Sequence, residues 1–289
     1  MALLTMLVDL RRLHHWTLEL WHGDHGWHSG SAQIAEELKG WCFEQNLPIH
    51  IDRATQEQTS SEDRARRWRY RQLLATALRT NSDVVTAHTA TDRTEGVLLN
   101  MARGCDLQGL SNLQEERLLS PEHQEGPRLR RPFLQITRSE TSEICKIFNV
   151  PIWSDPSNND ERYARNRIRH QVVPVLEELH PGSDRRIAAF SERMSHLRDS
   201  QRTLCKLALE YLLLDNALDR TRFKTLDCST CRSLLAAWLE QNGIPSLSST
   251  ALEDLTHRIC LNKANGTADI KKRWQMTWCK ESIRLIQAE

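Results

Sequence analysis

The sequence contains no long hydrophobic run, and no segment approaches the roughly 20 apolar residues that a membrane span requires. It also lacks the order of a signal peptide, in which basic residues precede an apolar stretch, because the chain opens with MALLTMLVDLRR. Both absences predict a cytoplasmic protein without a membrane partner.

Net charge and lysine are scarce as well. The formal charge is +1 over 289 residues, which excludes a basic field covering the whole molecule. Of the 39 basic residues, 31 are arginine, and they gather at 64–71, 128–131 and 162–169. Because a guanidinium can hold two oxygens at once, this bias favours specific phosphate contacts over diffuse attraction.

The last arginine cluster follows an acidic turn rich in serine and asparagine, in the stretch DPSNNDERYARNRIRH at 155–170. On a helix, Arg162, Arg165 and Arg169 would share one face, which could hold phosphates. Asn166 would add a neutral hydrogen-bonding group beside that charge. A solvated helix face is one alternative interpretation. Another is that Arg165 or Arg169 is internal and pairs with Asp155 or Asp160 to fix the turn, and the pattern alone leaves all three open.

Eight cysteines in a long chain without an export signal predict free, buried thiols rather than disulfides. Cys228 and Cys231 form a C-x-x-C pair, but a zinc site needs two further ligands and the sequence has no second pair. The segment HGDHGWH at 22–28 also contains ligand types at close spacing. We interpret it as a loop at a strand end and predict no metal site.

Strands and helices alternate in the first half of the chain. This order predicts an α/β fold with a parallel sheet and helices on both faces, in which ligands bind beyond the carboxyl ends of the strands. Segments 22–28 and 88–92 lie at such ends. The expected strands are 17–22, 48–53 and 83–87, and the expected helices are 31–45, 62–79 and 92–102.

The first and last parts of the chain differ from this alternation. Residues 2–13 have the spacing of a buried helix that no strand precedes, so we expect the sequence to be cut at its N-terminus. Residues 183–289 predict a smaller, mostly helical domain with a terminal hairpin, and the boundary is expected at 180–182. The domains would therefore span 1–182 and 183–289.

Four segments in order resemble the tRNA(Ile)-lysidine synthases, a family of PP-loop ATP pyrophosphatases with the adenine nucleotide alpha hydrolase-like fold. HGDHGWH resembles the family's H-x-N-H-G-L-R, and 87–110 resembles its A-H-H-x-D-D-Q-x-E-T block. RPFLQITRSE at 131–140 resembles R-P-L-L-x-x-x-R-x-E. The stretch from 155 to 182 resembles D-x-S-N-x-D-x-x-x-x-R-N-x-I-R-x-x-x-x-P-x-L.

The chain departs from the family at several positions. The S-G-G-x-D-S loop that binds pyrophosphate is absent, and the resemblance implies that it lies just upstream of Met1. Asp24 stands where the family usually has asparagine, and Thr91 replaces the first of two acidic residues. Cys105 lies in a loop that usually reads G-S-G.

The resemblance implies a ligation. ATP, with Mg²⁺, adenylates C2 of the wobble cytidine in a tRNA(Ile) with the anticodon CAU, and free L-lysine then displaces AMP. It gives catalytic roles to His88 and Asp92: Asp92 would hold the lysine ammonium or take its proton, and His88 would contact phosphate or shuttle the proton. Without the family, a helix cap and a loop histidine would be the favoured interpretation.

The remaining site residues follow from the same resemblance. His25, Arg103 and Gly104 would contact ATP, although Arg103 and Gly104 could equally be a helix end. The predicted tRNA contacts are Arg66, Arg69, Arg162, Arg165, Asn166 and Arg169.

Two alternatives to the ligase stay open. One is a catalytically inactive tRNA-binding remnant, and the other is a tRNA thiolase on the same scaffold, for which Cys105 is the one well-placed cysteine. The chain is also expected to be able to form a homodimer.

Overall fold

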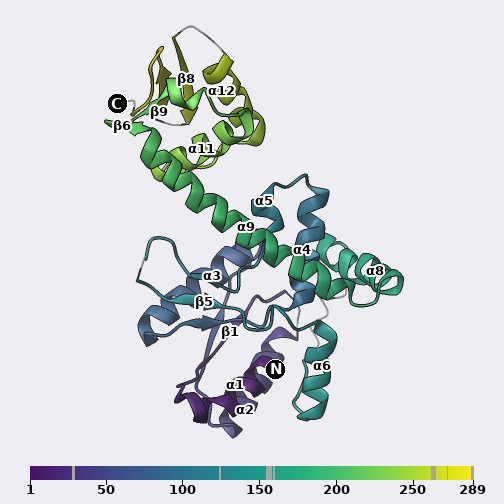
Figure 1. The fold of residues 1–289 in the computed structure, drawn as a ribbon. Helices are drawn as coiled ribbons and strands as arrows, with labels where there is room; N and C mark the ends of the chain where they lie inside the picture. The colour runs from purple at the N-terminus through teal and green to yellow at the C-terminus, as the bar shows by residue number, and fades with distance from the viewer. Residues whose placement is uncertain are drawn as a thin grey trace. The chain divides into compact units, whose positions relative to one another are not determined.

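The computed structural model describes residues 1–27, 30–123, 125–153, 158, 160–261, 265–271 and 273–287 (Figure 1). The chain divides into two compact units, Met1–Ser195 and His196–Glu289. The division falls within the long helix α9 (Ser183–Leu212). The boundary expected at 180–182 lies in the turn before this helix and stays a prediction.

The first unit contains the alternating elements that the sequence predicted between residues 2 and 102, with small shifts of their ends. Two of its helices begin at threonines that form capping boxes, in which side chain and backbone satisfy each other's hydrogen bonds. Its elements are α1 (Ala2–His14), β1 (Leu20–Asp24), α2 (Ser31–Glu44), β2 (Ile49–Arg53), α3 (Glu62–Thr80), β3 (Val84–Val85), α4 (Ala90–Ala102), α5 (Leu107–Leu110), β4 (Glu116–Leu118), β5 (Arg128–Arg130), α6 (Arg138–Ile147), α7 (Ala164–Arg167), the π-helix η2 (Ile168–Val172) and α8 (Val173–Leu179).

The strands of the first unit form two small sheets. β1 pairs in parallel with β2, and β3 pairs in parallel with β5. The α/β class with parallel strands is therefore confirmed. β4 adds to β5 in the antiparallel direction, which the sequence analysis missed because these strands have only three residues each.

Helices cover both faces of strand β1. Leu20 packs with Leu38 of α2 and with α1, whereas its neighbour Trp21 packs with Leu73 of α3. Successive side chains of a strand point to opposite faces, so one strand joins two hydrophobic clusters. A third cluster joins α1 to α6 through Leu3 and Cys145.

The second unit is built around an antiparallel sheet in the order β6-β7-β10-β9-β8. Its core includes Leu209 of α9, Leu235 of α11 and Met276 of β9, all of which are fully buried. The elements that follow α9 are β6 (Leu213–Leu214), β7 (Ala217–Asp219), α10 (Arg220–Phe223), α11 (Cys228–Gln241), α12 (Ser249–Leu261), β8 (Gly266–Lys271), β9 (Trp274–Trp278) and β10 (Ser282–Gln287).

The helices of the second unit pack with a sheet that the sequence predicted only in part. The predicted helices and the terminal hairpin are present, but five strands form one sheet. β6 and β7 are too short to leave a periodic pattern, and β7 finds its partner in β10, about 60 residues later, through Ser282 and Ile283.

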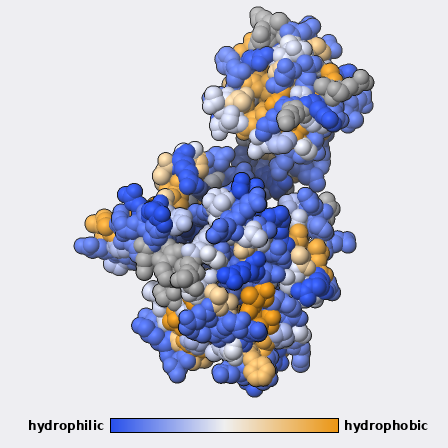
Figure 2. Space-filling view, turned by 180° about the vertical axis from the view of Figure 1, so that it is seen from behind, coloured by the Kyte–Doolittle hydropathy of each residue, from blue (hydrophilic) through white to orange (hydrophobic). Residues whose placement is uncertain are grey.

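No helix in the described parts of the chain combines the length and the apolar character needed to cross a bilayer. Figure 2 shows a mainly hydrophilic face with hydrophobic residues in several patches.

Candidate functional site

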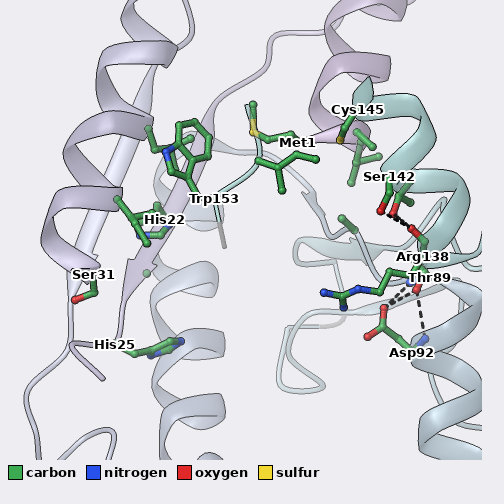
Figure 3. A pocket seen from close by; sticks show the side chains of 18 of the residues that line it. Met1, His22, His25, Ser31, Thr89, Asp92, Arg138, Ser142, Cys145 and Trp153 are labelled. Carbon is green, nitrogen blue, oxygen red and sulfur yellow. Dashed lines mark hydrogen bonds between the residues drawn. The ribbon is translucent and has the colours of Figure 1, made fainter. Parts of the chain in front are cut away.

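A cavity of about 490 Å³ lies in the first unit. Figure 3 shows its two sides: β1 and its following turn with α2 contribute to one, and the N-terminal ends of α4 and α6 contribute to the other. The lining residues are Met1, Ala2, Leu3, His22, Gly23, Asp24, His25, Gly26, Trp27, Ser31, Ile34, Leu38, Ala87, Thr89, Asp92, Phe133, Arg138, Thr141, Ser142, Cys145, Ile152 and Trp153.

The turn after β1 is held by the carboxylate of Asp24. Its Oδ1 accepts a 2.8 Å hydrogen bond from the backbone N–H of Gly26, and its Oδ2 lies 3.4 Å from Arg53. Burial raises the pKa of this carboxyl, but hydrogen bonds from Gly26 and Ser31 and the charge of Arg53 outweigh burial and lower it overall. Gly26 adopts a φ of 64°, which side chains with a Cβ disfavour. The turn places His25 in the pocket wall.

His25 packs among aromatic rings. Its centroid lies 4.9 Å from that of Trp27, nearly parallel, and 5.1 Å from that of Trp68, edge to face. Arg69 approaches its Nε2 to 3.1 Å. Trp27 is 40% exposed and lines the cavity, so it offers a flat apolar surface to a ligand. The predicted ATP contact of His25 stays a prediction.

Asp92 closes the N-terminal end of α4 and lines the same cavity. Its Oδ2 accepts a 2.8 Å hydrogen bond from the backbone of Thr89, whose hydroxyl accepts one from the backbone N–H of Asp92 in return. Its Oδ1 accepts a 3.1 Å bond from Arg165. Burial opposes ionisation of Asp92, but Arg165 and Thr89 outweigh it and lower the pKa. The helix cap weighed from sequence is present, and the carboxylate is ionised at neutral pH.

His88 precedes this cap by one residue. Its Nδ1 lies 2.9 Å from the hydroxyl of Thr86. Burial lowers its pKa to about 4; the charge of Asp92 opposes this shift, and three nearby arginines reinforce it. The imidazole is therefore neutral at pH 7. His88 is not among the cavity-lining residues, although Ala87 and Thr89 on either side are.

Thr91 joins three helices through one hydroxyl. It donates a 2.5 Å bond to the carboxylate of Asp184 in α9, and it accepts a 3.1 Å bond from the backbone N–H of Arg138 in α6. The backbone carbonyl of Asp184 also accepts a bond from Thr94. These contacts fix the N-terminal ends of α4 and α6 beside each other.

Arg138 also lines the pocket. It belongs to the motif RPFLQITRSE, but the sequence alone predicted no role for it. Figure 3 shows its guanidinium reaching into the cavity on the side of Asp92. The capping box of Thr137 and Glu140 sets the start of α6 and so the direction of this side chain. An arginine immediately after a helix cap was the signal that could have identified it.

Arg165 and Arg169 do not point toward solvent as a phosphate-holding face would. Arg165 Nε and Arg169 Nε each donate a 2.6 Å bond to the carboxylate of Glu95, whose side chain is completely buried. Arg165 also contacts Asp92. The competing interpretation of internal pairing fits their geometry, but their partners are Glu95 and Asp92. Their predicted role in tRNA binding stays a prediction.

The single helical face expected for the three arginines is not found. The helix α7 begins at Ala164, so Arg162 lies in the turn before it, 85% exposed and paired with Asp160. The buried Asn166 donates to the backbone carbonyl of Asp160 and ties the turn to the helix. Asp155 lies outside the described residues.

The 64–71 cluster forms a second concentration of positive charge. Arg66 and Arg117 stack on the ring of Tyr70, 5.5 and 5.2 Å from its centroid. Burial lowers the pKa of Arg69 and Arg131, and neighbouring guanidiniums add to this effect. Arg66, Arg69, Arg117 and Arg131 therefore gather around one tyrosine.

Comparison with known proteins identifies the family. A PP-loop domain model matches residues 1–176, and a model described as the TilS substrate binding domain matches residues 218–278. The tRNA(Ile)-lysidine synthase of Parasynechococcus marenigrum (strain WH8102) is 50% identical over 99% of this chain and 85% of that protein. The chain belongs to the tRNA(Ile)-lysidine synthase family. A relative of the same name from a strain of Prochlorococcus marinus is 44% identical over 99% of the chain and 86% of its own length.

A solved structure shares the fold of this family member. It is the U34-tRNA thiolase NcsA from Methanococcus maripaludis with its 4Fe-4S cluster, with a TM-score of 0.54 and 17% identity over 67% of this chain and 68% of that one. At this identity the likeness shows the fold alone.

Arg103 and Gly104 of this family member do not line the cavity. They follow the C-terminal end of α4, whose N-terminal end carries Asp92. A helix of 13 residues is about 20 Å long, which separates them from the pocket. Gly104 has a φ of 72°, as expected of a residue that ends a helix. The pocket geometry therefore gives no support to their contact with ATP, which stays a prediction.

Proposed function

We propose that the chain uses ATP to adenylate C2 of the wobble cytidine in a tRNA(Ile) with the anticodon CAU, and then transfers free L-lysine to that carbon to form lysidine. The relatives named above support the reaction class. The observation that carries the proposal is one cavity lined by an ionised carboxylate, Asp92, a guanidinium, Arg138, and an exposed ring, Trp27. Asp92 could bind the ammonium of lysine, Arg138 a phosphate of ATP, and Trp27 a nucleic acid base by stacking.

The titration states favour distinct roles for the two predicted catalytic residues. Asp92 has a lowered pKa and accepts bonds through both oxygens, so it is a weak base but a suitable partner for the lysine ammonium. His88 is neutral at pH 7, so its imidazole can take a proton in transit, although a pKa of about 4 makes it a weak base as well. We therefore assign Asp92 to hold the amine and His88 to relay its proton.

Arg138 would stabilise negative charge on the α-phosphate of ATP. Its guanidinium extends into the cavity from the start of α6, where backbone N–H groups of the first turn also favour an anion (Figure 3). Mg²⁺ would neutralise phosphate oxygens when bound. The pocket carboxylates Asp24 and Asp92 both already accept hydrogen bonds, so most of its ligands would be phosphates and water.

The structure divides the predicted tRNA contacts into two groups. Arg66 and Arg162 are exposed, so they are the candidates for direct phosphate contacts. Arg165, Asn166 and Arg169 instead hold the segment that carries Arg162, and the half-buried Arg69 contacts His25, so these four would support tRNA binding indirectly. The proposed partners are therefore tRNA, lysine and ATP; a homodimer stays a prediction.

The test is incorporation of labelled lysine into a tRNA(Ile) transcript with ATP and Mg²⁺. It is run with the 289-residue chain and with a form preceded by a strand and an S-G-G-x-D-S loop, because the given sequence contains no such loop. We expect lysine to enter the CAU transcript and not one in which the wobble cytidine is uridine. Incorporation by neither form, or equal labelling of both transcripts, would overturn the proposal.

The variant Asp92→Asn separates chemistry from binding. Loss of one charge contact in the transition state typically removes about 3 kcal/mol, so we expect lysine transfer to slow about a hundredfold in a form that is active. The affinity for tRNA should change little. Lys39→Ala, which removes an exposed ion pair with Glu36 outside the arginine clusters, is the control for unspecific damage.

The thiolase alternative finds little support in the pocket geometry. Cys105 follows Gly104 beyond the C-terminal end of α4, and so lies at the opposite end of that helix from Asp92. The one cysteine that lines the cavity is Cys145, whose side chain packs in the cluster between α1 and α6.

A further inference from the structure

Arg66, Arg117 and Arg131 surround the ring of Tyr70 in the first unit, and we call these four residues the Tyr70 cluster. Arg66 and Tyr70 lie on α3, Arg117 lies on β4, and Arg131 directly follows β5. The guanidinium carbons of Arg66 and Arg117 are 5.5 and 5.2 Å from the centre of the tyrosine ring. None of the four residues lines the cavity, so the proposed ATP site does not account for the cluster.

The pairing of β4 with β5 explains why two of these arginines face α3. Arg117 lies opposite Leu129, and the backbone N–H of Arg131 donates to the carbonyl of Glu115. Successive side chains of a strand alternate between faces, so Arg117 and Arg131 point to the same face as Leu129. Leu129 is fully buried in a hydrophobic cluster against which Tyr70 packs. The sheet therefore brings both guanidiniums to the helix.

The two faces of this sheet differ in how their charges are compensated. On the face that points away from Leu129, Arg128 and Arg130 both pair with Glu116. On the face of the Tyr70 cluster, no carboxylate in the described parts of the chain forms an ion pair with Arg66, Arg117 or Arg131. Three cations therefore meet around one ring without a carboxylate to balance them.

Arg131 forms the floor of the cluster and is only 2% exposed. Its Nη1 donates a 2.6 Å hydrogen bond to the carbonyl of Gln114. Its buried Nε has no hydrogen-bond partner among the residues that the structure describes. Burying a charge is costly unless the charge is paired and its donors are used. An anion beside Arg131 would supply both the opposite charge and the missing acceptor.

The other members of the cluster become more exposed from this floor to the surface. Tyr70 and Arg117 are half-buried, and Arg66 is exposed. Arg117 Nη1 donates to two backbone carbonyls at 2.8 and 3.4 Å, and these neutral acceptors fix the guanidinium without cancelling its charge. Burial raises the pKa of Tyr70, but Arg131, Arg66 and Arg117 outweigh burial and lower it. The electrostatic potential at the ring is therefore positive.

The Tyr70 cluster lies near the proposed catalytic groups. Arg69, the neighbour of Tyr70 in the sequence, brings its Nη2 to 3.1 Å from Nε2 of His25, which lines the cavity. Burial lowers the pKa of His88, and the charges of Arg131 and Arg69 reinforce this shift. An anion held by the cluster would therefore lie close to His88 but outside the cavity.

Building on the proposed function, in which tRNA is the substrate, we propose that the Tyr70 cluster binds one phosphodiester group of the anticodon loop, next to the nucleotide that is modified. A guanidinium can donate two hydrogen bonds to the oxygens of one phosphate. Arg131 and Arg117 hold the phosphate oxygens, and Arg66 at the rim attracts the strand. The RNA strand is favoured over ATP as the source of the phosphate because the cluster lies outside the cavity.

The experiment measures, without ATP, how tightly the whole chain binds an RNA stem-loop with the anticodon-arm sequence of a tRNA(Ile). Arg117→Gln is the variant, because it removes a half-buried guanidinium and leaves the buried Arg131 in place. Loss of one charged hydrogen-bonding group should weaken binding about tenfold. The slope of log affinity against log salt should fall by roughly 0.7, the value for one phosphate of a single strand.

A neutral phosphate analogue identifies the phosphate concerned. Single phosphates of the loop are replaced by methylphosphonates, one position at a time. At one position next to the wobble nucleotide, the replacement should weaken binding to the unsubstituted chain about tenfold, and Arg117→Gln should then cause no further loss. Additive effects at every position, or equal affinities of Arg117→Gln and the unsubstituted chain, would overturn the proposal.

Arg79→Gln is the matched control. Arg79 is exposed in the last turn of the same helix, outside the arginine clusters, and its Nη2 lies 3.5 Å from Nδ1 of His50. This variant should keep both the affinity and the salt slope. A loss as large as that of Arg117→Gln would show a general effect of charge and refute a specific site.

A measurement on the unsubstituted chain guards against variants that fail to fold. Phenylglyoxal modifies accessible arginines, and mass spectrometry of peptides reports each position separately. The RNA stem-loop should protect Arg66 and Arg117 but not Arg79. Unchanged modification of Arg66 and Arg117 would contradict the proposal, and equal protection by pyrophosphate at the same concentration would assign the cluster to a free phosphate instead.

Neither measurement requires ATP or lysine, so the cluster and the proposed function are tested separately. Lysine incorporation without protection of Arg66 and Arg117 would refute the phosphate site and leave the proposed function intact. Protection and coupling without lysine incorporation would support the site and refute the proposed function.

Discussion

Glu95 is the residue whose substitution most directly tests the internal arginine cluster. Its carboxylate is completely buried and accepts three hydrogen bonds from Arg165 and Arg169, which join α4 to the α7–η2 segment. Glu95→Gln keeps the shape of the side chain but removes the charge. Two guanidiniums would then lack their buried counter-ion.

The magnitude follows from the exposure of the two arginines. Removing one member of a buried ion pair typically costs about 3–5 kcal/mol because an uncompensated charge stays buried. Arg165 is 33% exposed and keeps Asp92, so water and Asp92 compensate part of its loss; Arg169 is only 13% exposed. We therefore expect the lower end, about 3 kcal/mol of unfolding free energy.

Because the chain has two units, a single unfolding curve does not define this quantity. Hydrogen exchange under increasing urea measures it locally, on peptides that cover α4 and α7–η2. Arg67→Ala, which removes an exposed pair, is the control and should change stability by less than about 0.5 kcal/mol. A loss below about 1 kcal/mol in Glu95→Gln would refute the reasoning from buried charge.

Variants of Arg169, inside this cluster, and of the exposed Arg162 separate arginines that support the fold from arginines that contact tRNA. Arg169→Ala should reduce stability but leave the slope of log tRNA affinity against log salt unchanged in the folded protein. Arg162→Ala should reduce that slope by roughly 0.7 to 0.9, the value for one lost phosphate contact. A flatter slope for Arg169→Ala would show that this side chain reaches tRNA directly. Two further predictions concern buried polar groups near the cavity. The pKa of His88 is about 4 in the folded state against 6.5 unfolded, so its contribution is fully present above pH 6.5 and is lost as the pH falls toward 4. Between pH 7.5 and pH 4.5, His88→Gln should therefore lose less stability than the native chain, by about 2 kcal/mol in hydrogen exchange under urea on peptides that cover α4; identical losses would contradict it. Asp184→Asn still accepts the Thr91 hydrogen bond and should change stability little, whereas Asp184→Ala should cost about 2 kcal/mol in the same hydrogen-exchange measurement, and equal effects would show that the bond is unimportant.

Local patterns in the sequence were sufficient for the helices and strands up to residue 102 and for the α/β class. A helix repeats every 3.6 residues and a strand every two, so these elements can be identified without knowledge of their partners. The cap at Thr89 and Asp92 is also a local property, since both partners lie within one helical turn. The family was recognisable because its motifs are contiguous segments.

Only the tertiary structure decided which groups meet. Arg165 pairs with Glu95, 70 residues away, and not with Asp160, the aspartate of the preceding turn that the structure describes. Arg138 enters the cavity because Thr91 and the capping box fix the start of α6. A buried charge takes the partner that the packing of helices brings within reach, and spacing along the chain does not contain that information.

Because sequence spacing does not specify distant partners, it also did not predict the sheet of the second unit or the surroundings of its cysteines. The sheet could not be foreseen because β7 and β10 pair across a long separation, and each short strand carries too few residues for a pattern. Cys231 and Cys228 form a C-x-x-C pair in the sequence, yet Cys231 is buried in the core of the second unit and Cys228 is exposed. The sequence determined the elements and the family, and long-range packing decided the charge pairs and the pocket.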